Sequence, residues 1–268
     1  MASSVVTVLL ACGGDEGGGN NGTSDGGTSG TSGTSGTSGT SGTSGTSGTS
    51  GTSGTSGTSG TSGASSSGGI VIGQPTKGVA TFYNATGEGN CSYPASPQDL
   101  DVAAMNTFQY DNSNVCGTCL KVEGPKATIT VRVTDRCPGC QLGQLDLSES
   151  AFAKIAEPIQ GKVPITWTPV SCSMTTPVTY HVKEGSSKFW TAISVRNHRL
   201  PIAKVEMQKG GNWVNAPRKD YNYFIIDGGI GTDGPFKVRV TAAGGQVLED
   251  ELPGPQAGKL FTGQKNFN

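Results

Sequence analysis

The sequence predicts a mainly β protein with two folded domains, preceded by a long segment that has no hydrophobic core. Past residue 73, short apolar segments alternate with Gly, Pro and Asn turns, as strands do. Before that point, Thr28–Gly63 repeats Thr-Ser-Gly twelve times, and chain of this composition buries too little apolar surface to offset its ordering entropy. Residues 74–268 are enough for two domains of about 100 residues each.

The first of these domains contains the clearest strands and the clearest helix. Apolar and polar residues alternate over Lys126–Thr134, and a second strand is expected over Val163–Val170. Ser148 is a suitable N-cap for a helix that Pro158 ends. A second, shorter helix is expected over Leu100–Met105.

The sequence of the second domain predicts strands and no helix. The expected strands are Val178–Lys183, Trp190–Val195, Lys204–Gln208, Asn222–Ile226 and Phe236–Thr241. Short strands at this spacing favour a β-sandwich. The predicted boundary gives domains of residues 74–174 and 175–268 with a linker of only a few residues, and Trp167 and Trp213 are expected in the two cores.

The first twelve residues are similar to a bacterial lipoprotein export signal. An apolar run, Val5–Ala11, leads directly to Cys12, which would be acylated after cleavage. The segment is shorter than a typical signal and lacks its basic region. We therefore expect a secreted or cell-surface protein, in which residues 13–73 form a disordered tether or a passive spacer.

The net charge of −1 argues against a nucleic-acid-binding protein. Residues 74–174 hold 7 basic and 9 acidic side chains, whereas residues 175–268 hold 12 basic and 8 acidic ones. The basic second domain would be attracted to acidic wall polymers such as pectin, or would simply present a mixed solvated surface.

Six further cysteines lie in or next to the first domain. Two C-x-x-C segments, Cys116–Cys119 and Cys137–Cys140, are separated by 17 residues, a spacing that also matches a structural zinc site. An even cysteine count in an exported chain favours disulfides instead. The sequence by itself leaves 15 pairings open.

The order of short motifs across both domains resembles that of bacterial expansins. In the first domain the matching segments are Gly78–Tyr83, Cys116–Cys119, Val122–Pro125, Val133–Pro138 and Leu145–Ser148. In the second domain they are Tyr180, Lys183–Ser187, Trp190, Val195–His198, Pro201 and Asp220–Asn222. The resemblance implies a six-stranded double-psi β-barrel with a short helix, followed by an immunoglobulin-like β-sandwich.

The resemblance also implies three disulfide pairs and a set of groove residues. The pairs are Cys91–Cys116, Cys119–Cys172 and Cys137–Cys140. In the groove, Asp146 matches the aspartate required for wall loosening, Asp135 a supporting polar residue, and Thr81 a groove threonine. Tyr83 replaces a small polar residue of the same groove, and Cys137 stands where an aromatic residue is usual.

In the second domain the resemblance implies a sugar-binding strip of aromatic side chains. Phe189, Trp190 and Tyr221 match a linear platform that stacks on cellulose, and Lys183 matches a lysine beside it. A flat ring can bury the axial C–H face of a pyranose. Strand alternation alone would instead place Phe189 and Trp190 on opposite faces.

The expected function is loosening of cellulose or other β-glucans without cleavage. Related endoglucanases carry a catalytic base where this chain has Ala85, and Glu88 is the one nearby substitute. Without a base to activate water, hydrolysis should be very slow. The alternatives are a weak endoglucanase, a peptidoglycan lytic enzyme, or a pure cellulose-binding adhesion protein. We expect a monomer with no cofactor or metal.

Overall fold

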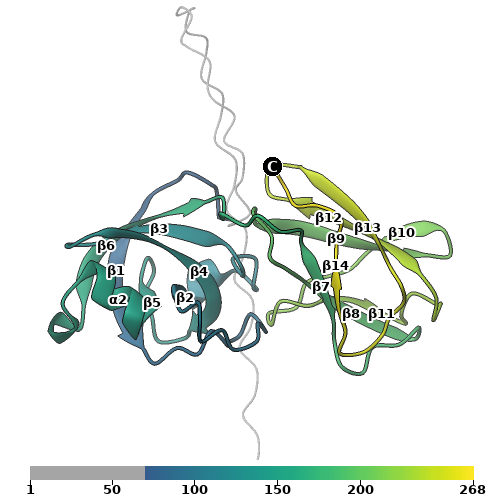
Figure 1. Cartoon of the computed structure of the whole chain (residues 1–268), viewed down its shortest axis with the longest axis horizontal. Coiled ribbons are helices and arrows are strands. Elements are labelled where there is room, and N and C mark those ends of the chain that lie inside the picture. The colour runs from purple at the N-terminus through teal and green to yellow at the C-terminus, as the bar shows by residue number, and fades with distance from the viewer. Residues whose placement is uncertain (1–69) are drawn as a thin grey trace, which may run out of the picture. The chain divides into compact units, whose positions relative to one another are not determined.

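The computed structural model describes residues 70–268 (Figure 1). The predicted export segment, Cys12 and all but the last four residues of the predicted tether lie outside this range. The barrel and the sandwich described below belong to one compact unit. Within residues 70–268, the helices are all too short or too polar to cross a membrane.

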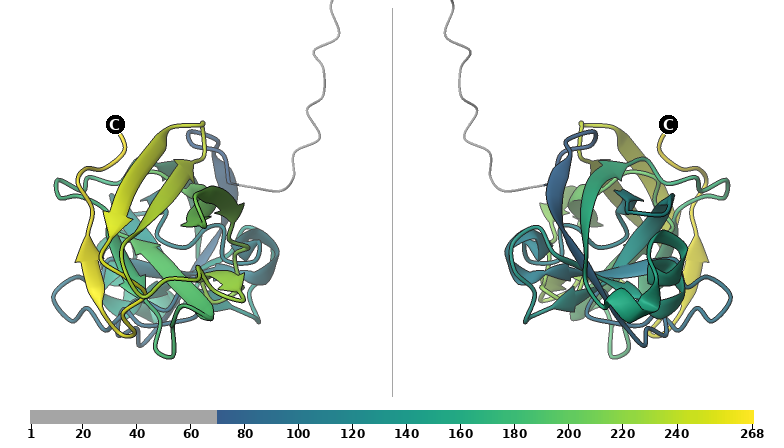
Figure 2. Two further views of the ribbon diagram at one scale, coloured as in Figure 1. Left: turned by 90° about the vertical axis from the view of Figure 1, so that its right-hand side faces the viewer. Right: turned by 90° about the vertical axis from the view of Figure 1, so that its left-hand side faces the viewer.

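The first half is a closed six-stranded β-barrel with strand order β1-β5-β2-β4-β3-β6. Its strands are β1 (Thr76–Tyr83), β2 (Val102–Asn106), β3 (Cys119–Glu123), β4 (Thr128–Cys137), β5 (Leu145–Ser148) and β6 (Val163–Val170). The β1–β5 and β2–β4 pairs are parallel, and the other pairs are antiparallel. Figure 2 shows the barrel facing the viewer in its right panel.

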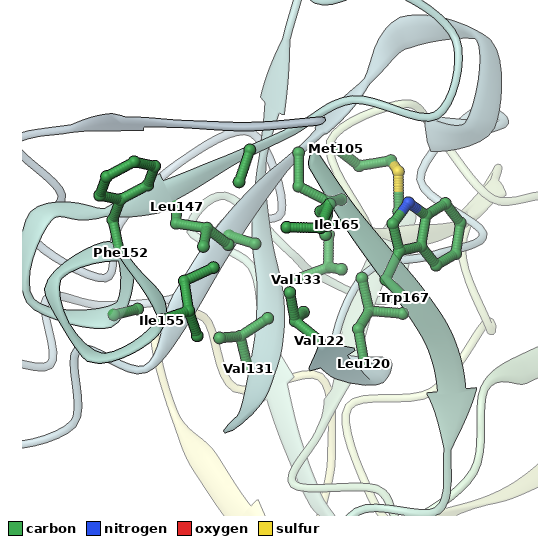
Figure 3. Close-up of a cluster of buried hydrophobic side chains, with 14 of the residues drawn as sticks. Met105, Leu120, Val122, Val131, Val133, Leu147, Phe152, Ile155, Ile165 and Trp167 are labelled. Carbon is green, nitrogen blue, oxygen red and sulfur yellow. The ribbon is translucent and has the colours of Figure 1, made fainter. Parts of the chain in front are cut away.

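Alternate residues of the barrel strands form its core (Figure 3). The labelled members are Met105, Leu120, Val122, Val131, Val133, Leu147, Phe152, Ile155, Ile165 and Trp167. Helix α2 (Glu149–Ile155) covers part of this core, and the Ser148 hydroxyl caps it by accepting a hydrogen bond from the Ala151 N–H at 3.1 Å. The predicted helix start at Ser148 and the predicted strand over Val163–Val170 are confirmed.

The helix predicted over Leu100–Met105 is wrong, because this segment forms strand β2. All five residues of β2 are buried between β4 and β5, so the segment needs no polar face. A short buried strand cannot be distinguished from a helix by its periodicity. The helix begins only afterwards, as α1 (Thr107–Tyr110), and a 3-10 turn, η1 (Pro158–Gln160), follows α2.

The second half is a sandwich of two four-stranded sheets, ordered β10-β9-β12-β13 and β11-β8-β7-β14 (Figure 2, left). Strands near the predicted positions are β7 (Thr179–Val182), β8 (Trp190–Arg196), β9 (Ile202–Lys209), β11 (Phe224–Asp227) and β12 (Phe236–Ala242). Three strands were not predicted from the sequence: β10 (Asn212–Asn215), β13 (Val247–Leu252) and β14 (Leu260–Thr262). Each of these three lies at the edge of its sheet.

The two tryptophans expected in the cores behave differently. Trp167 is buried, and its indole N–H donates to the Gly143 carbonyl at 2.9 Å. Trp213 is not a core residue, because its neighbour Val214 faces the core and strand alternation places Trp213 on the outer face of β10. There the Arg239 guanidinium lies 4.1 Å from the centre of its ring.

Three disulfides cross-link the barrel, in the pairs that the resemblance implies. They join Cys91 to Cys116, Cys119 to Cys172, and Cys137 to Cys140. Both C-x-x-C segments therefore serve as cross-links in this structure. The Cys119–Cys172 bond closes a loop with a sequence separation of 53 residues, which stabilises the fold by about 4 kcal/mol on the chain-entropy model.

Stability is expected to fall as the pH drops from about 6.5 to 4, because His198 is buried in its neutral form. Its ring Nδ1–H donates to the Leu200 carbonyl at 2.8 Å. The pKa of His198 is lowered to about 4, chiefly by desolvation; the Leu200 hydrogen bond opposes this shift, and the charges of Arg218 and Arg132 add to it. Below pH 6.5 the side chain of His198 is protonated in the unfolded chain, whereas it stays neutral in the folded protein down to about pH 4. This difference lowers the free energy of unfolding by about 3 kcal/mol at pH 4.

Urea unfolding at several pH values checks this expectation. His198→Asn keeps a donor for the Leu200 carbonyl but does not titrate. We expect the loss of stability between pH 6.5 and 4 to be smaller in the variant by about 3 kcal/mol. Equal losses in both proteins would show that His198 does not drive the effect.

Candidate functional site

Four residues on adjacent barrel strands form one row across the sheet. Thr81 of β1 is in register with Asp146 of β5, Asp146 with Ala104 of β2, and Ala104 with Asp135 of β4. Leu145 and Leu147 face the core, so Asp146 between them faces outward. With about 4.8 Å between neighbouring strands, the backbones of the two aspartates are about 10 Å apart.

Asp146 is held by a short hydrogen bond and is half-buried. The Thr81 hydroxyl donates to Asp146 Oδ1 at 2.6 Å, and Gln144 Nε2 donates to the same hydroxyl at 3.1 Å. Burial raises the pKa of Asp146, the Thr81 hydrogen bond lowers it, and the charge of Asp135 raises it. The net shift is upward, so Asp146 keeps its proton to a higher pH than an exposed aspartate does.

Asp135 is fixed as a hydrogen-bond acceptor by the backbone. Its Oδ1 accepts the N–H groups of Asn90 and Arg136, both at 2.7 Å. Gly89 allows this contact, since a Cβ atom there would lie 2.3 Å from the Asp135 carboxyl carbon. Gln144, Asn90 and Gly89 were not predicted as site residues, because no local motif marks a side chain whose role comes from a distant loop.

Tyr83 lies close to both carboxylates. Desolvation raises the pKa of Tyr83 to about 12, helped by the charges of Asp135 and Asp146, while nearby Thr134 lowers it. The buried Tyr83 hydroxyl makes no hydrogen bond of normal geometry to any residue in the described range, and the same holds for the Thr134 hydroxyl. The phenol is therefore neutral, with the Thr134 hydroxyl as a nearby but poorly aligned partner.

Replacing Tyr83 by Phe is expected to stabilise the protein by about 1 kcal/mol, because a buried hydroxyl without a partner loses its hydration for no compensating bond. Chemical denaturation of the wild type and Tyr83→Phe measures the difference. Tyr110→Phe is the matched control, since the Tyr110 hydroxyl donates to the Asp220 carbonyl at 2.9 Å and its loss should destabilise. A destabilised Tyr83→Phe would mean that this hydroxyl has a partner in the folded protein.

The structure brings no second acid to the position expected for a catalytic base. Ala85 is buried, and its N–H donates to the Tyr83 carbonyl at 2.9 Å. Glu88 is exposed, and its Oε2 accepts a long 3.4 Å hydrogen bond from the Thr86 hydroxyl. None of the hydrogen bonds found in residues 70–268 links Glu88 to Asp146.

The predicted aromatic strip lies around β8 and the loop before β11. Trp190 and Tyr221 are partly buried against a small outer cluster of Ala192, Tyr223 and Ile225. Phe189 precedes β8, which begins at Trp190, and 72% of its surface is exposed. Strand alternation therefore does not force the two neighbouring rings onto opposite faces.

Tyr223 supports this outer cluster, although the sequence did not mark it as a site residue. It is buried, its ring centre lies 5.9 Å from that of Tyr221, and its hydroxyl is 2.7 Å from His181 Nδ1. Lys183 Nζ lies 5.2 Å from the centre of the Tyr223 ring, which places the predicted lysine within the cluster. The two-residue spacing of Tyr221, Tyr223 and Ile225 is the signal that could have revealed it.

Hydrogen bonds join the loop that carries Tyr221 to the barrel. Asn90 Nδ2 donates to the Asp220 carbonyl at 2.7 Å, and the Ser92 hydroxyl donates to the Tyr221 carbonyl at 2.8 Å. Since the Asn90 N–H also holds Asp135, one short segment of the barrel contacts both a groove acid and the backbone of the aromatic strip.

The fold and the site together define a class of proteins in which a double-psi β-barrel carries an outward-facing acid and a β-sandwich carries a face of aromatic side chains. A protein-family model described as lytic transglycolase matches residues 76–167. The chain is 42% identical over 173 residues to Expansin-YoaJ of Bacillus subtilis, covering 62% of this chain and 74% of that protein. It is 30% identical over 200 residues to Expansin-like protein 5 of Dictyostelium discoideum, covering 70% and 84%.

The solved structures agree with these relatives. The apo expansin of Clavibacter michiganensis is 37% identical, with a TM-score of 0.66 over 73% of this chain and 98% of that one. A point mutant of the same protein, solved in complex with cellohexaose, gives a TM-score of 0.67 at the same identity and coverage. The chain belongs to the expansin family.

Proposed function

We propose that the protein binds cellulose and related β-1,4-glucans and loosens their contacts without cutting them. The observation that carries this proposal is the asymmetry of the groove. Asp146 has a donor at its side and a raised pKa, while the position expected for a base holds a buried alanine, Ala85. The complex of a related expansin with cellohexaose supports the choice of ligand.

Binding is assigned to the aromatic strip of Phe189, Trp190 and Tyr221. Each ring offers a flat apolar face to the axial C–H groups of a pyranose. Phe189 is mostly exposed, and Trp190 and Tyr221 rest on a packed cluster that fixes their positions. A row of fixed rings suits a straight, flat glucan chain and loses little side-chain entropy on binding.

Loosening is assigned to hydrogen-bond competition in the barrel groove. Protonated Asp146 can donate to a glucan oxygen, and the fixed carboxylate of Asp135 can accept from a glucan hydroxyl. The Tyr83 hydroxyl is buried, so it is not assigned a contact with the glucan. Together these groups can replace hydrogen bonds between neighbouring glucan chains, which requires no broken covalent bond.

A weak hydrolase is the second candidate, because Asp135 is a second acid in the same row of residues as Asp146 and its charge raises the pKa of Asp146. Inverting glycosidases use such a pair of carboxyl groups, one as acid and one as base. The family model described as lytic transglycolase points the same way. Against this, Asp135 Oδ1 already accepts two backbone N–H groups.

Parallel measurements of mechanical weakening and product release decide between these functions. Wild type and Asp146→Ala are applied to cellulose paper and to peptidoglycan, and soluble reducing ends are quantified alongside paper strength. We expect weakening by the wild type only and no soluble product from either protein. Product formed by the wild type and lost in Asp135→Asn or Glu88→Gln would identify a hydrolase. Unchanged weakening in Asp146→Ala would leave binding alone as the function.

The site of action that we propose is the cell exterior. Export with acylation at Cys12 would place the protein on the cell surface, and export without it would release the protein. Pectin and peptidoglycan are further candidate polymers, the first because the sandwich carries more basic than acidic residues. We propose that the protein acts as a monomer without a cofactor.

A further inference from the structure

Two of the large apolar side chains that the barrel exposes, Phe108 and Leu142, lie on segments that are joined by hydrogen bonds. Phe108 of α1 has 73% of its surface exposed, and Leu142, in the loop before β5, has 70%. A single exposed apolar residue is ordinary. Here both residues lie beside members of one hydrogen-bond network that ends in the groove.

The network connects α1 to the loop before β5. Asn106 Nδ2 donates to Gln109 Oε1 at 2.7 Å and to the Gln144 carbonyl at 3.2 Å. The Gly143 N–H donates to the same Gln109 oxygen at 2.9 Å. Phe108 therefore lies between network members in the chain, and Leu142 directly precedes Gly143.

The same network reaches the groove acid. Gln144 Nε2 donates to the Thr81 hydroxyl, which donates to Asp146. The Gln144 side-chain oxygen accepts the Gln141 N–H at 3.2 Å, so the turn that carries Leu142 is closed by the side chain that contacts Thr81. Phe108 and Leu142, named the groove rim, thus lie on α1 and on the turn before β5, each next in the chain to a residue of the network that leads to Thr81 and Asp146.

The groove rim is held rigidly. The Cys137–Cys140 disulfide precedes the Leu142 turn, and the buried Trp167 indole donates to the Gly143 carbonyl. The turn packs directly on β1, since a Cβ atom at Gly78 would lie 1.9 Å from the Gly143 carbonyl oxygen. Apolar side chains kept exposed on fixed loops lose little entropy when they contact a ligand.

We propose that the groove rim, Phe108 with Leu142, is an apolar contact site for one or two sugar rings of the same glucan chain that reaches Asp146. This inference rests on the proposed function. Phe108 follows the end of β2, where Asn106 is in register with Cys137 at the end of β4. Side chains of the network (Thr81, Asn106, Gln109 and Gln144) are neutral, which suits a polyhydroxyl chain without charge.

The test measures loosening of cellulose paper per molecule bound, so that a change in the groove is separated from a change in the aromatic strip. Phe108→Ala is expected to lower this ratio about fivefold, and Phe108→Ala with Leu142→Ala by about tenfold, while the amount bound stays within a factor of about two. Phe108→Trp should restore the wild-type ratio. Ile159→Ala, which truncates a barrel residue with 95% of its surface exposed, is the matched control and should change nothing.

Two results would overturn the groove rim as a sugar contact. One is a wild-type ratio in both Phe108→Ala and the double variant while Asp146→Ala is inactive. The other is an equal loss in Ile159→Ala. Failure of the wild type to weaken paper would instead refute the proposed function. Exposed truncations change stability little, so unchanged thermal unfolding should accompany each variant.

Discussion

Replacing Asp146 by Asn is expected to reduce wall loosening at least about tenfold while cellulose binding stays within a factor of about two. The amide is a weaker donor than a carboxylic acid and cannot change between donor and acceptor by exchanging a proton, while the Thr81 hydroxyl that donates to Asp146 Oδ1 at 2.6 Å can still find an acceptor there. The aromatic strip is untouched. Paper weakening and cellulose pull-down, measured on the same protein preparations, give the two quantities.

The same variant is expected to be more stable than the wild type at neutral pH. Burial raises the pKa of Asp146 in the folded protein above its value in the unfolded chain. The folded state therefore binds the proton more tightly, and the stability gained from it is present at low pH and lost as the pH rises through the folded pKa.

Asp146→Ala, which removes the carboxyl without introducing an amide, should be equally inactive in loosening.

Asp99→Asn is the matched control for these measurements. Asp99 is an exposed barrel acid that pairs with Arg132 at 3.3 Å, and exposed pairs contribute little. Its loosening activity should equal that of the wild type. If Asp146→Asn remained active while folded, the groove acid would have no role in loosening.

Replacing Trp190 and Tyr221 together by Ala is expected to weaken cellulose binding roughly a hundredfold, because two contact rings of this kind are worth about 3 kcal/mol. Binding isotherms on microcrystalline cellulose at low and high salt provide the measurement. Stacking is insensitive to salt, whereas attraction through the basic sandwich would be screened. The loss should therefore be the same at both salt concentrations.

Trp213→Ala is the control for this prediction. Trp213 is also a partly exposed sandwich aromatic, but it lies in the other sheet beneath Arg239. Its truncation should leave binding unchanged. Loss of binding in Trp213→Ala, or full binding in the Trp190 and Tyr221 double variant, would assign cellulose to a different surface.

Features that depend only on short stretches of sequence were predicted correctly. These features are the helix cap at Ser148, the alternating strand over Val163–Val170 and the all-β character of the second domain. Each depends on residues that are close together in the chain. Failures occurred where burial from both sides removes the alternation, as in β2, and at short edge strands such as β10. The outward Trp213 belongs to the same class of error.

The sequence by itself determined the β architecture, the motifs of an expansin and the identity of the groove and strip residues as candidates. Only the tertiary structure decided how they are supported: that Thr81 and Gln144 hold Asp146, that backbone N–H groups fix Asp135, and that Tyr223 packs against Tyr221. These partners come from strands and loops far apart in the chain. Their contacts depend on closure of the barrel, which pairs strands that are not consecutive in the chain.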